Sequence, residues 1–149
     1  MDKKTKHLHL VLDQHDVDLY NKYYKIKNPY SRKPPIDKPL HPTLNRWSVM
    51  PRPAANALKQ KWTDFICFWM KSQNLNGMML DDLDVEMTVY VSNHRRMDID
   101  GRVPKFILDA WTECGFIVDD CYTYLHSLTL RIEYDKNHER TEFDIYYRQ

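Results

Sequence analysis

Two aspartates separated by one residue, Asp98 and Asp100, are the side chains of this sequence best suited to bind a metal ion. In an extended segment, side chains two residues apart project from the same side, about 6.6–7 Å apart along the chain. Two carboxylates on one face repel each other unless a cation lies between them. Mg²⁺ and Mn²⁺ prefer oxygen ligands and commonly take only one or two carboxylates from the protein. The spacing therefore favours a divalent-metal site, which is a common device for phosphodiester hydrolysis.

A second acidic pair, Asp119 and Asp120, follows about twenty residues later, beyond a short helical pattern. A strand–helix–strand unit can bring the start of its second strand beside the end of its first, so we expect a third carboxylate to arrive from this pair. Two alternatives involve no metal. Asp100 would then cap the following helix, and Asp119 and Asp120 would form a solvated turn. Asp-x-Asp alone is common in loops, whereas the two pairs around a lysine-bearing helix are a more specific pattern.

The elements that must position these groups follow from the hydrophobic pattern. Alternating apolar residues predict strands over 7–12, 84–92, 121–134 and 141–147. Helical spacing predicts one helix from Pro53 to near Gly77 and a second over 103–111, ended by Gly115. The order β, long loop, α, β, α, β, β predicts a single α+β (mixed α/β) domain over 1–149. Its small mixed sheet would have about four strands, with two main helices.

The segment between about residues 20 and 53 is basic and rich in proline and tyrosine. From Tyr20 to Trp62 there are ten Lys/Arg residues and one acid, Asp37. Seven prolines between 29 and 53 exclude regular structure there and predict a long loop. A basic segment beside a carboxylate cluster suggests an anionic polymer held near a cation. The alternative is a mobile, solvated loop without a ligand.

Composition excludes several other classes. A hydrophobic content of 42% and an aromatic content of 13% are typical of a globular protein. No run of about 18 apolar residues is present, so we expect no membrane span. The N-terminal residues lack an apolar signal core, and three cysteines without CxxC spacing favour a reducing compartment. We therefore expect a cytoplasmic protein.

The stretch RRMDIDGRVPKFILDAWTECGFIVDD resembles the signature of the RusA-type crossover junction endodeoxyribonucleases of bacteria and their phages. That family has Arg-Arg-x-Asp-x-Asp-Asn, then a lysine, Leu-Asp-Ala-Leu-x-x-x-Gly and Asp-Asp. The matching positions here are Arg95, Arg96, Asp98, Asp100, Leu108 to Ala110, Gly115, Asp119 and Asp120. The resemblance covers most of the chain, and the part from Arg95 to Asp120 is specific.

Two positions depart from the family pattern. Gly101 replaces the asparagine that follows the second aspartate. Lys105 lies five residues past that aspartate instead of four, because lysine and proline have exchanged order. Helix geometry could turn the Lys105 side chain away from the metal, so Arg102 is a substitute cation.

The resemblance implies a RusA-like fold, a homodimer, and Mg²⁺- or Mn²⁺-dependent hydrolysis of four-way (Holliday) DNA junctions in a bacterial or phage-infected cell. Asp98, Asp100 and Asp120 would hold the metal, with Asp119 orienting water or a ligand. Lys105 or Arg102 would stabilise developing negative charge. Tyr23, Tyr24 and Tyr30 would stack on exposed bases or pack under the loop. The cations implied for DNA binding are Arg95, Arg96, Arg102, Lys22, Lys25, Lys27, Arg32 and Lys33.

Two further hypotheses stand beside a junction-resolving nuclease. One is a junction- or DNA-binding protein of the same fold whose catalysis has weakened or been lost, which the two departures favour. The other is a nuclease with the same metal chemistry that acts on flaps or other branched DNA.

Overall fold

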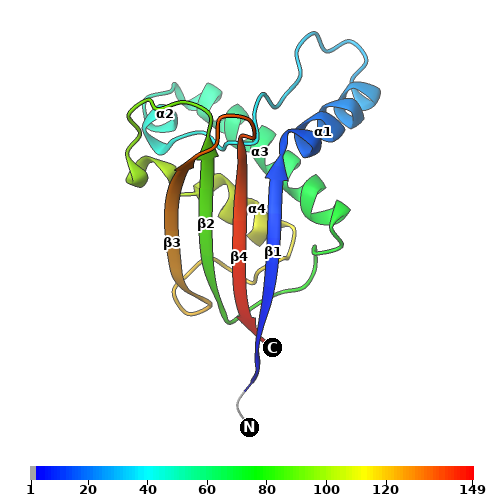
Figure 1. Ribbon diagram of the computed structural model, residues 1–149. Coiled ribbons are helices and arrows are strands. Elements are labelled where there is room, and N and C mark those ends of the chain that lie inside the picture. The colour runs from blue at the N-terminus through cyan, green and yellow to red at the C-terminus, as the bar shows by residue number, and fades with distance from the viewer. Residues whose placement is uncertain (1–2) are drawn as a thin grey trace.

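A four-stranded mixed sheet forms the centre of the computed structural model, which describes residues 3–149 (Figure 1). Its strands are β1 (Thr5–Asp13), β2 (Leu83–Val91), β3 (Leu125–Tyr134) and β4 (Arg140–Arg148). Their order across the sheet is β1-β4-β2-β3. Strand β4 pairs antiparallel with β1 and with β2, and β2 pairs parallel with β3. The predicted class, a small α+β domain with about four strands in a mixed sheet, is confirmed.

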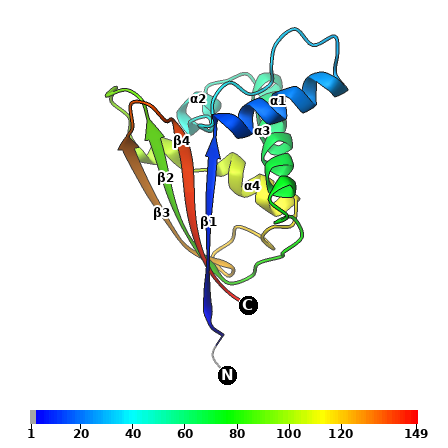
Figure 2. The same cartoon turned by 45° about the vertical axis from the view of Figure 1, so that its right-hand side comes forward.

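Helices cover one face of this sheet (Figure 2). They are α1 (Gln14–Lys27), α2 (Leu44–Ser48), α3 (Arg52–Ser72) and α4 (Lys105–Glu113), and a short 3₁₀ helix, η1 (Ile99–Arg102), precedes α4. Proline lies in the first turn of α3, where its missing N–H has no cost. Gly115 follows α4 with a φ of +74°, the left-handed conformation that a helix end favours. Within residues 3–149, no helix is long and apolar enough to cross a membrane.

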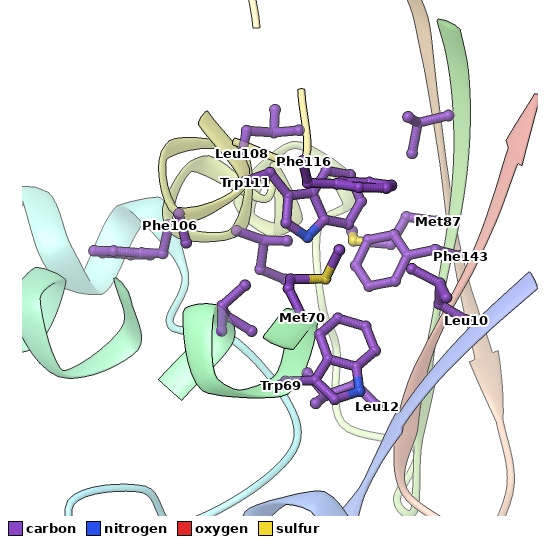
Figure 3. Packing of buried hydrophobic residues seen from close by; sticks show 14 of the residues in the cluster. Leu10, Leu12, Trp69, Met70, Met87, Phe106, Leu108, Trp111, Phe116 and Phe143 are labelled. Carbon is purple, nitrogen blue, oxygen red and sulfur yellow. The ribbon is translucent and has the colours of Figure 1, made fainter. Parts of the chain in front are cut away.

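The core lies between the sheet and helices α3 and α4 (Figure 3). Strand β2 alternates strictly, with Val85, Met87, Val89 and Val91 buried as predicted. Trp69 and Met70 of α3 and Trp111 of α4 pack toward Phe143 of β4. Burying each such side chain contributes about 1.5–3 kcal/mol. The strand that leads to Asp98 is therefore firmly anchored.

The predicted loop over about residues 20–53 is wrong at both ends. Residues 20–27 belong to α1, and Leu44–Ser48 form α2. The prolines begin at position 29, after α1 has ended, so they do not oppose this helix. The two predicted helices correspond to α3 and α4, and α1, with 14 residues, is a further helix that the hydrophobic pattern did not indicate. The overlooked signal is a capping box, in which Asp13 and Asp16 each accept a backbone N–H from the other.

The other face of the sheet is polar. His7 and His9 of β1 project from it, while Leu10 and Leu12 point into the core, as the alternation predicted. His7 Nε2 lies 2.7 Å and His9 Nδ1 lies 2.9 Å from the same Asp144 oxygen on β4. These histidines are therefore held by a neighbouring carboxylate on the exposed face.

Candidate functional site

The topology gathers most of the predicted DNA-binding cations at one end of the sheet. Strands β1 and β2 run in the same direction because both are antiparallel to β4, and Asp13 and Tyr90 both pair with Arg140. Helix α1 follows β1, and the segment with Arg95 and Arg96 follows β2. Figure 1 shows α1 and α2 at this end of the sheet. The sequence thus places two separate basic segments at the end where β1 and β2 finish.

A cleft of about 490 Å³ opens at this end, and we name it the arginine cleft. The segment 35–46, helix α3 and the residues after β2 contribute to its walls. The only acids in its lining are Asp37 and Glu139, and Glu139 lies 3.8 Å from Lys38 Nζ. A concave surface with this excess of positive charge attracts polyanions. Its cations are Lys38, Arg46, Arg95, Arg96 and Arg102.

Asp98 and Asp100 lie in the segment that borders the arginine cleft. The Asp98 side chain is 61% exposed, and its Oδ1 lies 3.6 Å from Nε of Arg96. Asp100 is also exposed. The prediction that the two side chains project from the same side assumed an extended segment. Only Asp98 has an extended backbone, and Asp100 lies inside η1. Neither side chain caps a helix: η1 and α4 both begin without a side-chain cap.

The second acidic pair lies elsewhere. Asp119 and Asp120 precede β3, and Leu125 at the start of β3 pairs with Leu83 at the start of β2. Parallel strands align their starts, so the expectation that this pair would arrive beside the end of β2 is wrong. Figure 1 shows the chain entering β3 at the opposite end of the sheet. Burial, followed by the neighbouring Asp119, raises the pKa of Asp120.

The three carboxylates predicted to bind the metal are therefore not grouped in this structure. Among residues 3–149, no three His, Cys, Asp or Glu side chains are grouped to hold a metal ion. The donor chemistry at Asp98 and Asp100 still matches a hard cation, because Mg²⁺ commonly takes one or two protein carboxylates and keeps several waters. These two exposed carboxylates fit such an ion, and Asp119 and Asp120 do not join them.

Arg102 and His41 connect η1 to the proline-rich segment. Arg102 is 8% exposed, and its Nη1 donates to the His41 carbonyl over 2.8 Å. In return, His41 Nε2 donates to the Arg102 carbonyl over 2.9 Å. Burial lowers the pKa of Arg102 and lowers that of His41 to about 4. Arg102 therefore fixes the loop beside Asp100, in addition to lining the cleft.

Lys105 is engaged with a residue of its own helix. Its Nζ lies 3.4 Å from Oδ2 of Asp109, one turn along α4, and Lys59 of α3 approaches the same oxygen at 3.3 Å. The Lys105 ammonium also lies 6.0 Å from the ring centre of Trp47. The shifted position of Lys105 thus directs its charge toward Asp109.

The remaining predicted cations lie on α1 and just after it. Lys22, Lys25 and Lys27 are exposed on α1. Lys25 Nζ donates to the Ser31 carbonyl over 2.6 Å. Lys25 also lines a small cleft of about 200 Å³ together with Arg32 and Lys33. These side chains form a second basic surface at the same end of the sheet.

Comparison of the sequence with models of known protein families and with curated proteins found no match in either.

The contacts made by two residues of this region, Asp109 and His41, were not predicted from the sequence. Asp109 had a usable signal, because it lies four residues after Lys105, the spacing at which helical ion pairs form. His41 had none, since its hydrogen bond with Arg102 joins positions 61 residues apart.

Proposed function

We propose that this chain is a Mg²⁺- or Mn²⁺-dependent endodeoxyribonuclease that resolves four-way DNA junctions by paired phosphodiester hydrolysis. One observation supports it above the others: the arginine cleft lies directly beside the exposed carboxylates of Asp98 and Asp100. The resemblance of residues 95–120 to the RusA-type enzymes supplies the class of substrate.

Two surfaces of the chain would bind the DNA, the arginine cleft and the second basic surface. Arg95 and Arg96 line the cleft and would hold phosphates of the scissile strand. The Arg96 side chain is 92% exposed, so its contact with Asp98 is weak and is open to exchange for a phosphate. Lysines of α1 and the following basic residues would hold a neighbouring duplex arm.

Asp98 and Asp100 would hold the metal ion through their carboxylate oxygens. A bound divalent ion supplies charge stabilisation at the phosphate and a water of lowered pKa. Arg102 keeps η1, and with it Asp100, fastened to the proline-rich segment through the two hydrogen bonds with His41. Positioned cations beside the phosphate, here Arg95 and Arg96, stabilise developing negative charge.

A homodimer is part of the same proposal. A four-way junction has twofold symmetry, and two identical subunits would supply two matched sites for the two incisions.

A second function, junction binding without cleavage, has specific support. Asp120 lies before the start of β3 and is not grouped with Asp98 and Asp100, and Lys105 is paired with Asp109. Both features remove groups that the resemblance assigns to catalysis. Such a protein would still present the arginine cleft to DNA.

The experiment uses a labelled synthetic four-way junction, a matched linear duplex and a flap, each incubated with Mg²⁺, Mn²⁺ or EDTA. Asp100→Asn should keep junction affinity and lose cleavage by about 100-fold or more. Asp81→Asn is the matched control, because Asp81 is an exposed acid before β2. Cutting by Asp100→Asn at the parental rate would refute the metal assignment. Metal-dependent cutting of flaps in preference to junctions would indicate the flap nuclease, and tight binding without any cutting would indicate the second function.

A further inference from the structure

A cleft of about 760 Å³ lies between α1 and α3, apart from the arginine cleft, and we name it the tyrosine cleft. Each helix contributes one stripe of side chains at spacings of three and four residues, so the two stripes face each other. The residues proposed to hold the metal ion and the scissile strand do not line this cleft, and only its Lys27 is among the α1 lysines proposed to hold a duplex arm. The stripes consist of Tyr20, Tyr23, Tyr24 and Lys27 on α1, and of Asp64, Cys67, Phe68 and Lys71 on α3.

Aromatic rings dominate the interior of the tyrosine cleft. Tyr20 is buried, and its ring centre lies 5.2 Å from that of Phe68. The ring of Tyr23 lies 4.9 Å from the same phenylalanine at an angle of 32°, yet Tyr23 remains 44% exposed. The ring of Tyr23 thus packs against Tyr20 and Phe68 and remains partly accessible to solvent. Supported, partly exposed rings are suited to stacking with a planar ligand.

Positive charge surrounds these rings. Lys27 Nζ lies 5.7 Å from the Tyr23 ring centre, and Lys71 lines the opposite wall. The one acid in the lining, Asp64, already accepts a hydrogen bond from the Gln60 amide over 2.8 Å. The cleft therefore combines stacking surface with two cations that have phosphate-binding chemistry.

The tyrosine cleft is continuous with the second basic surface. Tyr24 lines both this cleft and the small cleft formed by Lys25, Arg32 and Lys33. Three further cations, Lys25, Arg32 and Lys33, therefore lie next to the rings of the tyrosine cleft. No acid lines the small cleft. A single strand of DNA alternates bases with phosphates and would meet this alternation of rings and cations along its length.

We propose that the tyrosine cleft binds single-stranded DNA, with an unpaired base stacked on Tyr23 and the flanking phosphates held by Lys27 and Lys71. The stacking surface favours a nucleobase over an acidic peptide, which would use only the cations. This activity goes beyond cleavage, because it requires neither Asp98 nor a metal ion.

The test measures the anisotropy of a short labelled oligothymidylate in EDTA. Tyr23→Ser should raise the Kd about tenfold, and Tyr23→Phe, which keeps the ring, should leave it unchanged. Lys71→Gln should raise the Kd and lower the salt slope by about 0.7. The matched controls are Tyr122→Ser, at a tyrosine that is 87% exposed before β3, and Lys4→Gln, at an exposed lysine before β1.

A second readout isolates stacking from charge. A strand with a single 2-aminopurine should lose fluorescence on binding the parent and Tyr23→Phe, and keep it with Tyr23→Ser. Equal affinity of parent and Tyr23→Ser would overturn the proposal. So would tyrosine-dependent binding of an acidic peptide together with no binding of the oligonucleotide. Asp100→Asn should bind the strand like the parent, so loss of cleavage and loss of strand binding are separate outcomes.

Discussion

Acid should weaken the connection between the proline-rich segment and η1, because this connection depends on a neutral imidazole. His41 is 1% exposed, and its Nε2 donates to the Arg102 carbonyl. Burial lowers the pKa of His41 from 6.5 to about 4. Between pH 6.5 and about pH 4, His41 is therefore mostly protonated in the unfolded chain but mostly neutral in the folded protein.

The size of the effect follows from this pKa difference. Each pKa unit corresponds to about 1.4 kcal/mol. The contribution of His41 is fully present above the unfolded pKa of 6.5 and is lost as the pH falls toward about 4. The free energy of unfolding should thus fall by about 3 kcal/mol over this range from this side chain alone. Total stabilities of proteins are about 5–15 kcal/mol, so the loss is large.

Urea unfolding from about pH 7 to about pH 4.5 measures this contribution. His41→Gln keeps an N–H donor for the Arg102 carbonyl but does not titrate, so its stability should depend less steeply on pH than that of the parent. Other titrating groups are common to both proteins and cancel in the difference. His15→Gln, at an exposed histidine of α1, should behave like the parent. Identical pH slopes for the parent and His41→Gln would refute the reasoning.

Three further predictions concern stability and the role of Lys105. Asp16→Asn should raise the free energy of unfolding at neutral pH by about 1 kcal/mol, because burial raises the pKa of Asp16 from 3.8 to about 6. The gain should disappear in acid, where the folded carboxyl is protonated, and urea titrations at both pH values check it. Gly115→Ala should cost about 1 kcal/mol or more in thermal unfolding, since φ is +74° and the new Cβ would lie 3.2 Å from a methionine sulfur. Gly77→Ala, with φ of +82° in open space, should cost less. Lys105→Ala should leave the junction Kd nearly unchanged in an anisotropy titration, because Lys105 is paired with Asp109, and a tenfold loss of affinity would contradict this.

Local patterns explain which elements could be predicted from the sequence. Strand β2 was predictable because Val85, Met87, Val89 and Val91 alternate with polar residues on a sheet buried on one face. Helix α1 was not, because its buried side carries only Val17 and Tyr20 as fully buried residues within a basic, tyrosine-rich segment. Its capping box was the stronger signal, and it lies outside the hydrophobic pattern.

The candidate site depended on long-range geometry that spacing alone does not contain. Asp98 and Asp100 were identified from their spacing; both are exposed, and Asp98 lies beside Arg96. The position of Asp120 depends on the register between β2 and β3, which no local pattern specifies. The contact between His41 and Arg102 likewise forms only when the proline-rich segment folds over η1.

Five cations line the arginine cleft, although the formal net charge of the whole protein is only +1. At physiological ionic strength, charges are screened beyond about 8 Å. A distant DNA molecule therefore experiences almost no pull from the protein as a whole. Under the proposed function, attraction would begin only after near-contact, and only for approaches that present the end of the sheet where the arginine cleft and the second basic surface lie. Productive encounters would thus be selected by orientation, and the protein would spend little time attached to DNA through its other surfaces.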